Sequence, residues 1–190
     1  MTPDMIPWVI VRATGVTAIV ALAAAMVAGL LVRTRTPVGG VKGAGMVELH
    51  RLFSATALWA IAVHGTALLF DTTMVVTPLD LLVPGAIPYR PLATGMGVIA
   101  AELALAIHVS FRFRGRIGVK AWRRLHFLTY AVFGLGLAHG ILAGTDASRG
   151  WMVATYGGAA GAVCALTAWR AATAPRRACL LYTSPSPRDR

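Results

Sequence analysis

The sequence predicts an all-α integral membrane protein, a bundle of five transmembrane helices with its N-terminus outside and its C-terminus inside. Three observations predict this fold class. Of the 190 residues, 57% are hydrophobic and only 13% are charged, about half the charged share of a soluble domain. Five stretches are apolar for about 20 residues, the length that crosses a bilayer. Lysine and arginine gather in alternate connections, which gives each span a direction.

The composition also excludes several classes of protein. Intrinsically disordered chains are poor in apolar residues and rich in charge, so this chain is not one of them. A soluble enzyme is not expected, because nothing would cover so much apolar surface. The net charge of +11 suggests nucleic acid, but a basic nucleic-acid binder presents its charge on a polar, soluble body. We therefore expect the lipid bilayer as a partner and no nucleic acid.

The first two spans are defined by nearly uninterrupted apolar runs. Ala13–Val32 contains no charged residue, and Leu52–Phe70 is interrupted only by His64. The second helix is expected to begin near Met46. The segment that follows, Asp71–Pro91, contains several prolines around a central LDLLV run. Because proline cannot donate a backbone hydrogen bond, we expect a loop here, with a short interfacial helix.

The remaining three spans follow at regular intervals. Leu92–Phe111 contains Glu102 and His108, Leu125–Ala143 contains two histidines, and Trp151–Trp169 is free of charge. A charged carboxylate at mid-membrane costs about 2.5–3.5 kcal/mol, so Glu102 is expected to be protonated or paired inside the bundle. His108 lies near the inner end of its span and is expected to be an interfacial histidine.

The basic residues determine the predicted orientation. Connections rich in lysine and arginine stay inside the cell, and thirteen such residues fall on one side against three on the other. We expect a multi-pass protein of the cell (inner) membrane. The inner residues are Arg33, Arg35, Lys42, Arg51, Arg112, Arg114, Arg116, Lys120, Arg123, Arg124, Arg170, Arg176 and Arg177. The outer ones are Arg12, Arg90 and Arg149.

The last twelve residues differ from the rest. Residues 179–190 read CLLYTSPSPRDR, a polar segment without hydrophobic periodicity that looks like the translation of a sequencing adapter. We expect this tail to be non-native and exclude it from the fold. Residues 1–178 then form one membrane domain, whose native chain is expected to continue further. Cys164 is left as the one cysteine of that domain, so no intrachain disulfide is expected.

Four of the five histidines form two pairs. His50 and His64 are 14 residues apart on the second span, or about 21 Å, and His126 and His139 are 13 apart on the fourth, or about 20 Å. Both spans run from inside to outside, so His50 and His126 share the inner level while His64 and His139 share the outer one. Ionisable residues within spans are costly and usually functional. This arrangement fits two bis-histidine haems stacked across the membrane.

The spacing suits the second span better than the fourth. Fourteen residues return to within about 40° of the same helix face, whereas thirteen leave His126 and His139 about 140° apart. We therefore expect the fourth helix to be distorted, or its two histidines to be approached from different sides. Gly134 and Gly136 lie between them and are the expected places for a distortion.

The segments around these histidines resemble the ferric reductase-like transmembrane domain. That family includes the membrane parts of NADPH oxidases and ferric-chelate reductases, and the haem subunit of a bacterial periplasmic methionine-sulfoxide reductase system. The resemblance covers a core of about residues 46–147. It rests on LHRLFSATALWAIAVHG at 49–65, IPYRPLATGMGV at 87–98 and RGRIGVKAWRRLHFLTYAVFGLGLAHGILAGTDA at 114–147.

The resemblance implies two haem b groups. His50 and His126 would hold the inner haem, and His64 and His139 the outer one. The chain departs from the oxidases in two ways. The oxidases have six spans where this chain has five, and no flavin or nicotinamide domain is present in this chain. FAD is therefore expected only through a missing domain or a partner.

Four arginines are candidates for contacts to the cofactor. Arg51, Arg123 and Arg124 flank the inner histidines, where arginine suits haem carboxylates and, equally, lipid headgroups. Arg90 lies in the proline-framed loop at the outer surface. We expect it to cover the edge of the outer haem or to contact an acceptor.

These observations predict a di-haem b electron-transfer module, the membrane component of an oxidoreductase. It would carry electrons from a cytoplasmic flavin or nicotinamide donor, docked on the basic segment 112–124, to an outer acceptor. Ferric iron, oxygen, a quinone and a periplasmic partner protein stay open as acceptors. One alternative is an accessory cytochrome subunit with no acceptor site of its own. Another is a non-redox membrane protein, either a small ion or metal transporter or a scaffold, whose histidines are proton or metal sites.

Overall fold

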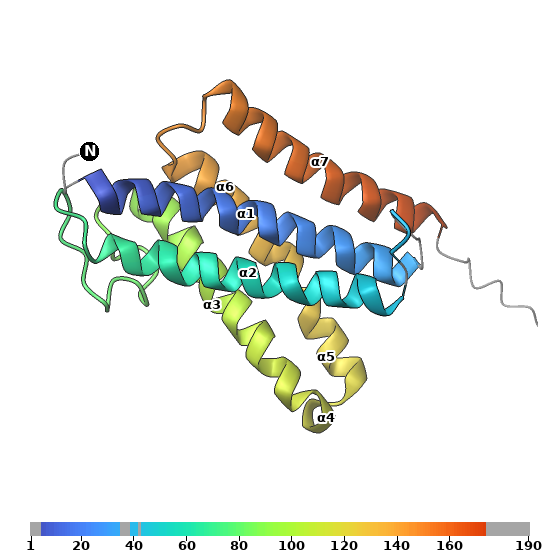
Figure 1. Cartoon of the computed structure of the whole chain (residues 1–190). Helices are drawn as coiled ribbons and strands as arrows, with labels where there is room; N and C mark the ends of the chain where they lie inside the picture. The colour runs from blue at the N-terminus through green and yellow to red at the C-terminus, as the bar shows by residue number, and fades with distance from the viewer. Residues whose placement is uncertain (1–4, 35–38, 42, 174–190) are drawn as a thin grey trace, which may run out of the picture.

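The computed structural model describes residues 5–34, 39–41 and 43–173, and its architecture is helical (Figure 1). The predictions for Arg35, Lys42, Arg176, Arg177 and the tail at 179–190 fall outside the described residues. The long helices are α1 (Met5–Thr34), α2 (Ala44–Leu68), α3 (Pro91–Ser110), α5 (Val119–His126), α6 (Thr129–Ala143) and α7 (Gly150–Thr173). A short 3₁₀ turn, η1 (Phe111–Phe113), and α4 (Arg114–Ile117) follow α3.

Five helical segments are long and apolar enough to cross a membrane, which confirms the predicted all-α bundle of five spans. The fourth of these segments, Val119–Ala143, combines α5 and α6. The first begins at Met5, about two turns before the predicted start at Ala13. The extension includes Arg12, whose charge is accommodated because it forms an ion pair with Asp146. The direction of the bundle in the membrane stays a prediction.

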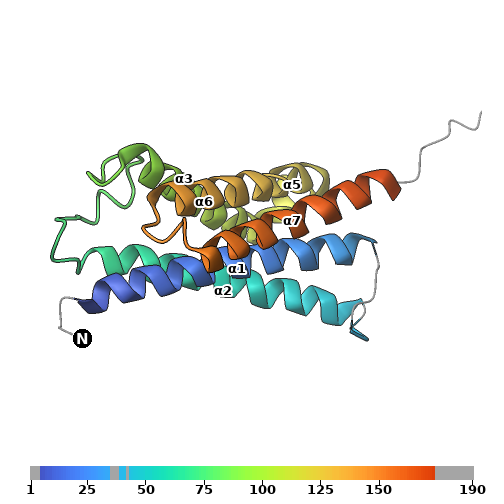
Figure 2. The same ribbon diagram turned by 90° about the horizontal axis from the view of Figure 1, so that it is seen from above.

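α1 is the central helix of the bundle. It packs along α2 on one side and against α6 and α7 on the other, while α3 packs along α6. Figure 2 shows α1 and α2 side by side in one layer, with α3 and α6 in a second. The α1–α2 contact is close because alanines fill it, as is usual where transmembrane helices pack tightly. The apolar core joins α1, α6 and α7 through Ile19, Ala23, Met26, Phe133, Met152, Tyr156 and Val163.

The fourth span is interrupted at Phe127 and Leu128, directly after His126. The backbone N–H groups of Phe127, Leu128 and Tyr130 donate to carbonyls three residues earlier, which is the 3₁₀ pattern. Each 3₁₀ residue adds about 20° of rotation, so three of them bring the angle between the two histidines from about 140° to about 80°. The predicted distortion at Gly134 and Gly136 is wrong, because α6 runs through both without a break.

The segment between α2 and α3 contains turns where a short helix was expected. Hydrogen-bonded turns at 77–80, 79–83 and 83–86 follow one another, and the prolines among them prevent a regular helix. Before these turns, at the start of the segment, Asp71 accepts hydrogen bonds from the hydroxyl and N–H of Thr73. These bonds, led by the one from the Thr73 hydroxyl, lower the pKa of the Asp71 carboxyl below its usual value. The expectation of an interfacial helix is therefore wrong.

An ionic cluster joins the start of α1 to the link between α6 and α7. The Arg12 guanidinium pairs with the Asp146 carboxylate, donates to the Thr145 hydroxyl at 3.0 Å and lies over the Trp8 ring at 4.1 Å. Arg149 pairs with the same carboxylate at 2.9 Å. Asp146 is therefore the shared acceptor that connects the first span to the last two.

Replacing Asp146 with asparagine is expected to lower the stability of the bundle by about 1–3 kcal/mol, less than the loss of a fully buried pair. The physical reason is that the side chains of Asp146 and Arg12 are only 12% and 28% exposed, so Arg12 loses its partner in a poorly hydrated place. Arg149 is 69% exposed, and the loss of its pair contributes little. Thermal unfolding in detergent measures the effect. Glu48→Gln is the matched control, because the Glu48–Arg51 pair is 66% and 72% exposed and is worth about 0–1 kcal/mol. Equal effects of the two substitutions would contradict the prediction.

Candidate haem-binding site

The structure places the four paired histidines at two levels of the bundle. The rings of His50 and His126 have their centres 6.1 Å apart, with their planes at 75°. The rings of His64 and His139 have their centres 6.0 Å apart, at 85°. The first pair lies toward the end that carries α4 and α5, here called the basic end, and the second lies toward the opposite end. α2 and α6 make few direct contacts, so these rings are a main link between the two helices.

Three of the four rings are held by a backbone carbonyl on a neighbouring helix. A carbonyl oxygen can only accept, so Nδ1 of each ring carries the proton and donates it. The neutral imidazole then presents an unprotonated Nε2, the form that binds a metal ion. Such a second hydrogen bond is usual for metal-binding histidines and fixes the orientation of the ring. The bonds join His50 to Ala25 (2.8 Å), His64 to Val11 (2.7 Å) and His139 to Ala93 (2.9 Å).

A glycine lies one helical turn after each of these carbonyls and makes room for the ring. The missing side chain lets the imidazole approach the helix backbone closely enough to reach the carbonyl. A Cβ added to these glycines would lie 3.3, 3.2 and 2.8 Å from the nearest ring atom. The pairs are Gly29 with His50, Gly15 with His64, and Gly97 with His139.

Sequence reasoning missed these glycines, although it contained a signal for two of them. Gly15 and Gly29 are 14 residues apart, the same spacing as His50 and His64. Two adjacent antiparallel helices with the same spacing place each histidine opposite one glycine. Gly97 has no second glycine at a matching spacing on α3. Its histidine, His139, is paired in the sequence with His126, and the described residues give His126 no glycine contact.

The donor set of each level fits haem iron. Two rings bonded to opposite sides of one ion, with bonds of about 2 Å and ring centres about 1 Å beyond each nitrogen, would have their centres about 6 Å apart. That value matches both pairs. A bare Zn²⁺ ion takes about four protein ligands, and the described residues contain no group of three or more His, Cys, Asp or Glu that could hold a metal. Haem needs only two, because the porphyrin supplies the others.

The predicted arginine contacts fall in different surroundings. Arg123 and Arg124 lie exposed on α5, beside the inner histidine. Arg51 pairs with Glu48 at 3.0 Å. Arg90 donates to the carbonyl of Leu142, one of the last carbonyls of α6, which have no partner within their own helix. Arg90 therefore fastens the loop to α6 in this structure, and a role at the outer haem stays a prediction.

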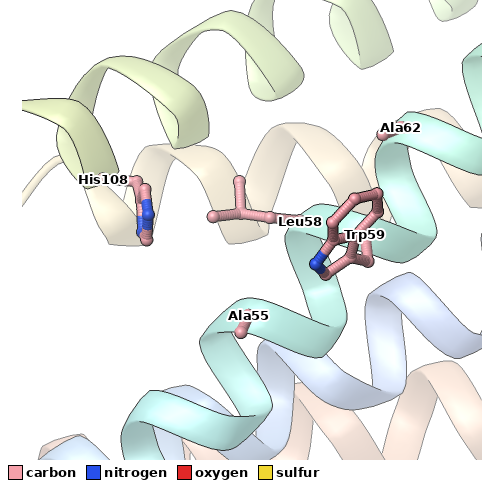
Figure 3. A pocket seen from close by; sticks show the side chains of 5 residues that line it. All are labelled: Ala55, Leu58, Trp59, Ala62 and His108. Atoms are coloured by element: carbon pink, nitrogen blue, oxygen red, sulfur yellow. The ribbon is translucent and has the colours of Figure 1, made fainter.

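His108 and Glu102 differ from the paired histidines. His108 faces the seam between α2 and α3, where a cavity of about 330 Å³ is lined by Ala55, Leu58, Trp59, Ala62 and His108 (Figure 3). His108 belongs to neither of the two histidine ring pairs. Glu102 is exposed on α3, so the expected pairing inside the bundle is wrong for the described residues, and the alternative that its carboxyl is protonated stays a prediction.

Comparison with known proteins agrees with this geometry. A family model described as "Ferric reductase like transmembrane component" matches residues 14–137, or 124 of the 190 residues. The match contains His50, His64 and His126 and ends two residues before His139. No curated protein and no solved structure matches the chain. With five membrane-spanning helices and this match over most of its length, the chain belongs to the ferric reductase-like transmembrane family.

Proposed function

We propose that the chain is a di-haem b module that carries single electrons across the membrane, from a cytoplasmic flavin or nicotinamide donor to an outer acceptor. Membership of the ferric reductase-like family suggests a membrane electron-transfer module, and the two haems and the direction are our extension of it. Haem, when bound, supplies the one-electron redox chemistry. The protein supplies the ligands, their orientation and a surrounding of low polarity.

The observation that carries the proposal is the pair of imidazole contacts at two levels. His50 with His126 and His64 with His139 each present two rings at about the spacing of a shared metal ion. The 14 residues from His50 to His64 separate the levels by about 21 Å along α2. Two relay centres at that separation would divide the crossing into shorter steps.

Charge supports the assignment of the donor side. The exposed basic residues of η1, α4 and α5 gather at the end of the bundle near His50 and His126. Basic connections face the cytoplasm in most membrane proteins. We propose that a flavoprotein or reductase domain docks there, since its acidic surface would be attracted to this charge. Ferric iron, oxygen, a quinone and a periplasmic protein are all compatible with the outer level.

The alternative of a metal-ion transporter is supported less well. A transport site for a bare ion needs several ligands at one depth, whereas each described level offers two imidazoles, and three of these four rings are oriented by backbone carbonyls. A rigid, two-nitrogen site suits a resident cofactor better than a passing ion. We therefore favour haem.

Difference spectroscopy of the purified protein tests the proposal. After expression with ample haem, the dithionite-reduced minus oxidised spectrum is expected to show b-type bands, and the pyridine haemochrome assay is expected to give two haems per chain. Proteoliposomes with an enclosed reductant should then reduce an impermeant ferric chelate outside. A colourless protein that is folded and monodisperse would overturn the proposal. One haem per chain would overturn its di-haem part.

A further inference from the structure

His126 differs from the other three paired histidines. Its Nδ1 is buried and has no hydrogen-bond partner among the described residues. The reason is the position of α5, which carries His126 as its last residue and projects from the basic end beside α3 and α4 (Figure 1). The other three rings face α1 or α3, where a glycine exposes a carbonyl. His126 has no corresponding glycine contact in the described chain.

His126 has an aromatic contact on the face of its ring, whereas the other three rings are held by a carbonyl at Nδ1. Trp122, one helical turn before His126, stacks on the imidazole with ring centres 5.0 Å apart and planes at 24°. Phe111 of η1 approaches the far side of this contact, with its ring edge-on to Trp122 at 5.5 Å and 68°. Offset stacking and edge-to-face contacts are the favoured geometries of aromatic pairs. Phe111 and Trp122, from two spans, thus form a chain of ring contacts that leads to His126.

We propose that Trp122 is the positioning residue for His126. Its indole determines the plane of the imidazole, which is the task that helix carbonyls perform for His50, His64 and His139. This inference rests on the proposed haem function and goes beyond it, since it distinguishes the two haems by what orients their ligands.

The two kinds of support have different consequences. A carbonyl bond selects both the plane of the ring and the nitrogen that carries the proton, and it makes the other nitrogen a stronger donor to the metal. A stack selects only the plane. The inner pair therefore has one strengthened ligand, His50, whereas the outer pair has two. The electronic properties of the inner haem should depend on Trp122, and those of the outer haem should not.

Substitution of Trp122 in the haem-loaded protein tests this inference. Trp122→Leu removes the stack and Trp122→Phe keeps an aromatic face of similar orientation. The readouts are the low-spin ferric EPR signals, which respond to the angle between the two imidazole planes, and a spectroscopic redox titration that resolves both haems. Trp59→Leu is the matched control, because Trp59 is 74% exposed and lines the cavity between α2 and α3 together with His108, which belongs to neither histidine pair (Figure 3).

Trp122→Leu is expected to shift the EPR signal and the midpoint potential of the inner haem and to leave both properties of the outer haem unchanged. Trp122→Phe should restore the shifted signal at least in part, and Trp59→Leu should change neither. The unchanged outer haem reports that the variant is folded; if Trp122→Leu does not accumulate, Trp122→Met carries the same test. An unchanged inner signal in the leucine or methionine variant would overturn the inference. Absence of haem from the unaltered protein would instead overturn the proposed function.

Discussion

Replacing His64 with alanine is expected to halve the haem b content of the purified protein. The substitution removes one of the two imidazoles at the outer level, whose ring centres are 6.0 Å apart, and leaves His139 as the one histidine of that pair that could hold a haem. His50 and His126 are about 21 Å away along the bundle, so the inner haem should remain. The pyridine haemochrome assay per mole of chain measures the loss. The same substitution should abolish reduction of an outer acceptor.

His108→Ala is the control for this experiment. It also removes an imidazole from a membrane span, but His108 lines the seam between α2 and α3 and belongs to neither histidine pair. Both haems should be retained in this variant. Full haem content in His64→Ala, or an equal loss in His108→Ala, would contradict the assignment of the outer pair.

Replacing Gly97 with alanine is expected to displace His139 and release most of the outer haem without removing any ligand. The added Cβ would lie 2.8 Å from Nδ1 of the His139 ring, closer than real contacts allow. The ring is held there by its bond to the Ala93 carbonyl, so relief requires breaking that bond. Overpacking of this kind costs about 1–3 kcal/mol, which corresponds to about 5- to 150-fold weaker haem retention. Haem loss to apomyoglobin gives the measurement.

A graded series makes the prediction specific. Gly15→Ala places its Cβ 3.2 Å from the His64 ring and should weaken the outer haem less. Gly29→Ala, at 3.3 Å from the His50 ring, should affect only the inner one. Gly157→Ala is the control, because nothing lies within 4 Å of its added Cβ. Equal effects at Gly97 and Gly157 would show that the space beside His139 is not needed.

Much of the fold could be predicted from the sequence because its signals are local. The number and length of the spans depend on runs of apolar residues, because the thickness of the hydrocarbon core sets how long such a run must be. The depth of each histidine follows from the same runs, since a helix rises about 1.5 Å per residue. The pairing of levels needed only the assumption that α2 and α6 are parallel.

Two of the predictions that failed concerned places where the backbone can form either a regular α-helix or tighter turns. The helix expected around Leu79–Val83 is replaced by turns, because proline removes backbone donors on both sides of a short run. The distortion expected at Gly134 and Gly136 occurs at Phe127 and Leu128 instead. Glycine permits a bend but does not require one, whereas the 3₁₀ turn rotates His126 toward the interior.

By itself the sequence determined that the chain is a five-span membrane bundle with histidines at two depths, because hydropathy and helical rise act along one segment at a time. Only the tertiary structure decided which ring nitrogens are free to bind a metal ion and what holds each ring. The carbonyls that orient His50, His64 and His139 lie 25, 53 and 46 residues away in the chain. Contacts of that range form only when helices pack, and His126, the one paired histidine without such a carbonyl bond, stacks on Trp122 of its own helix.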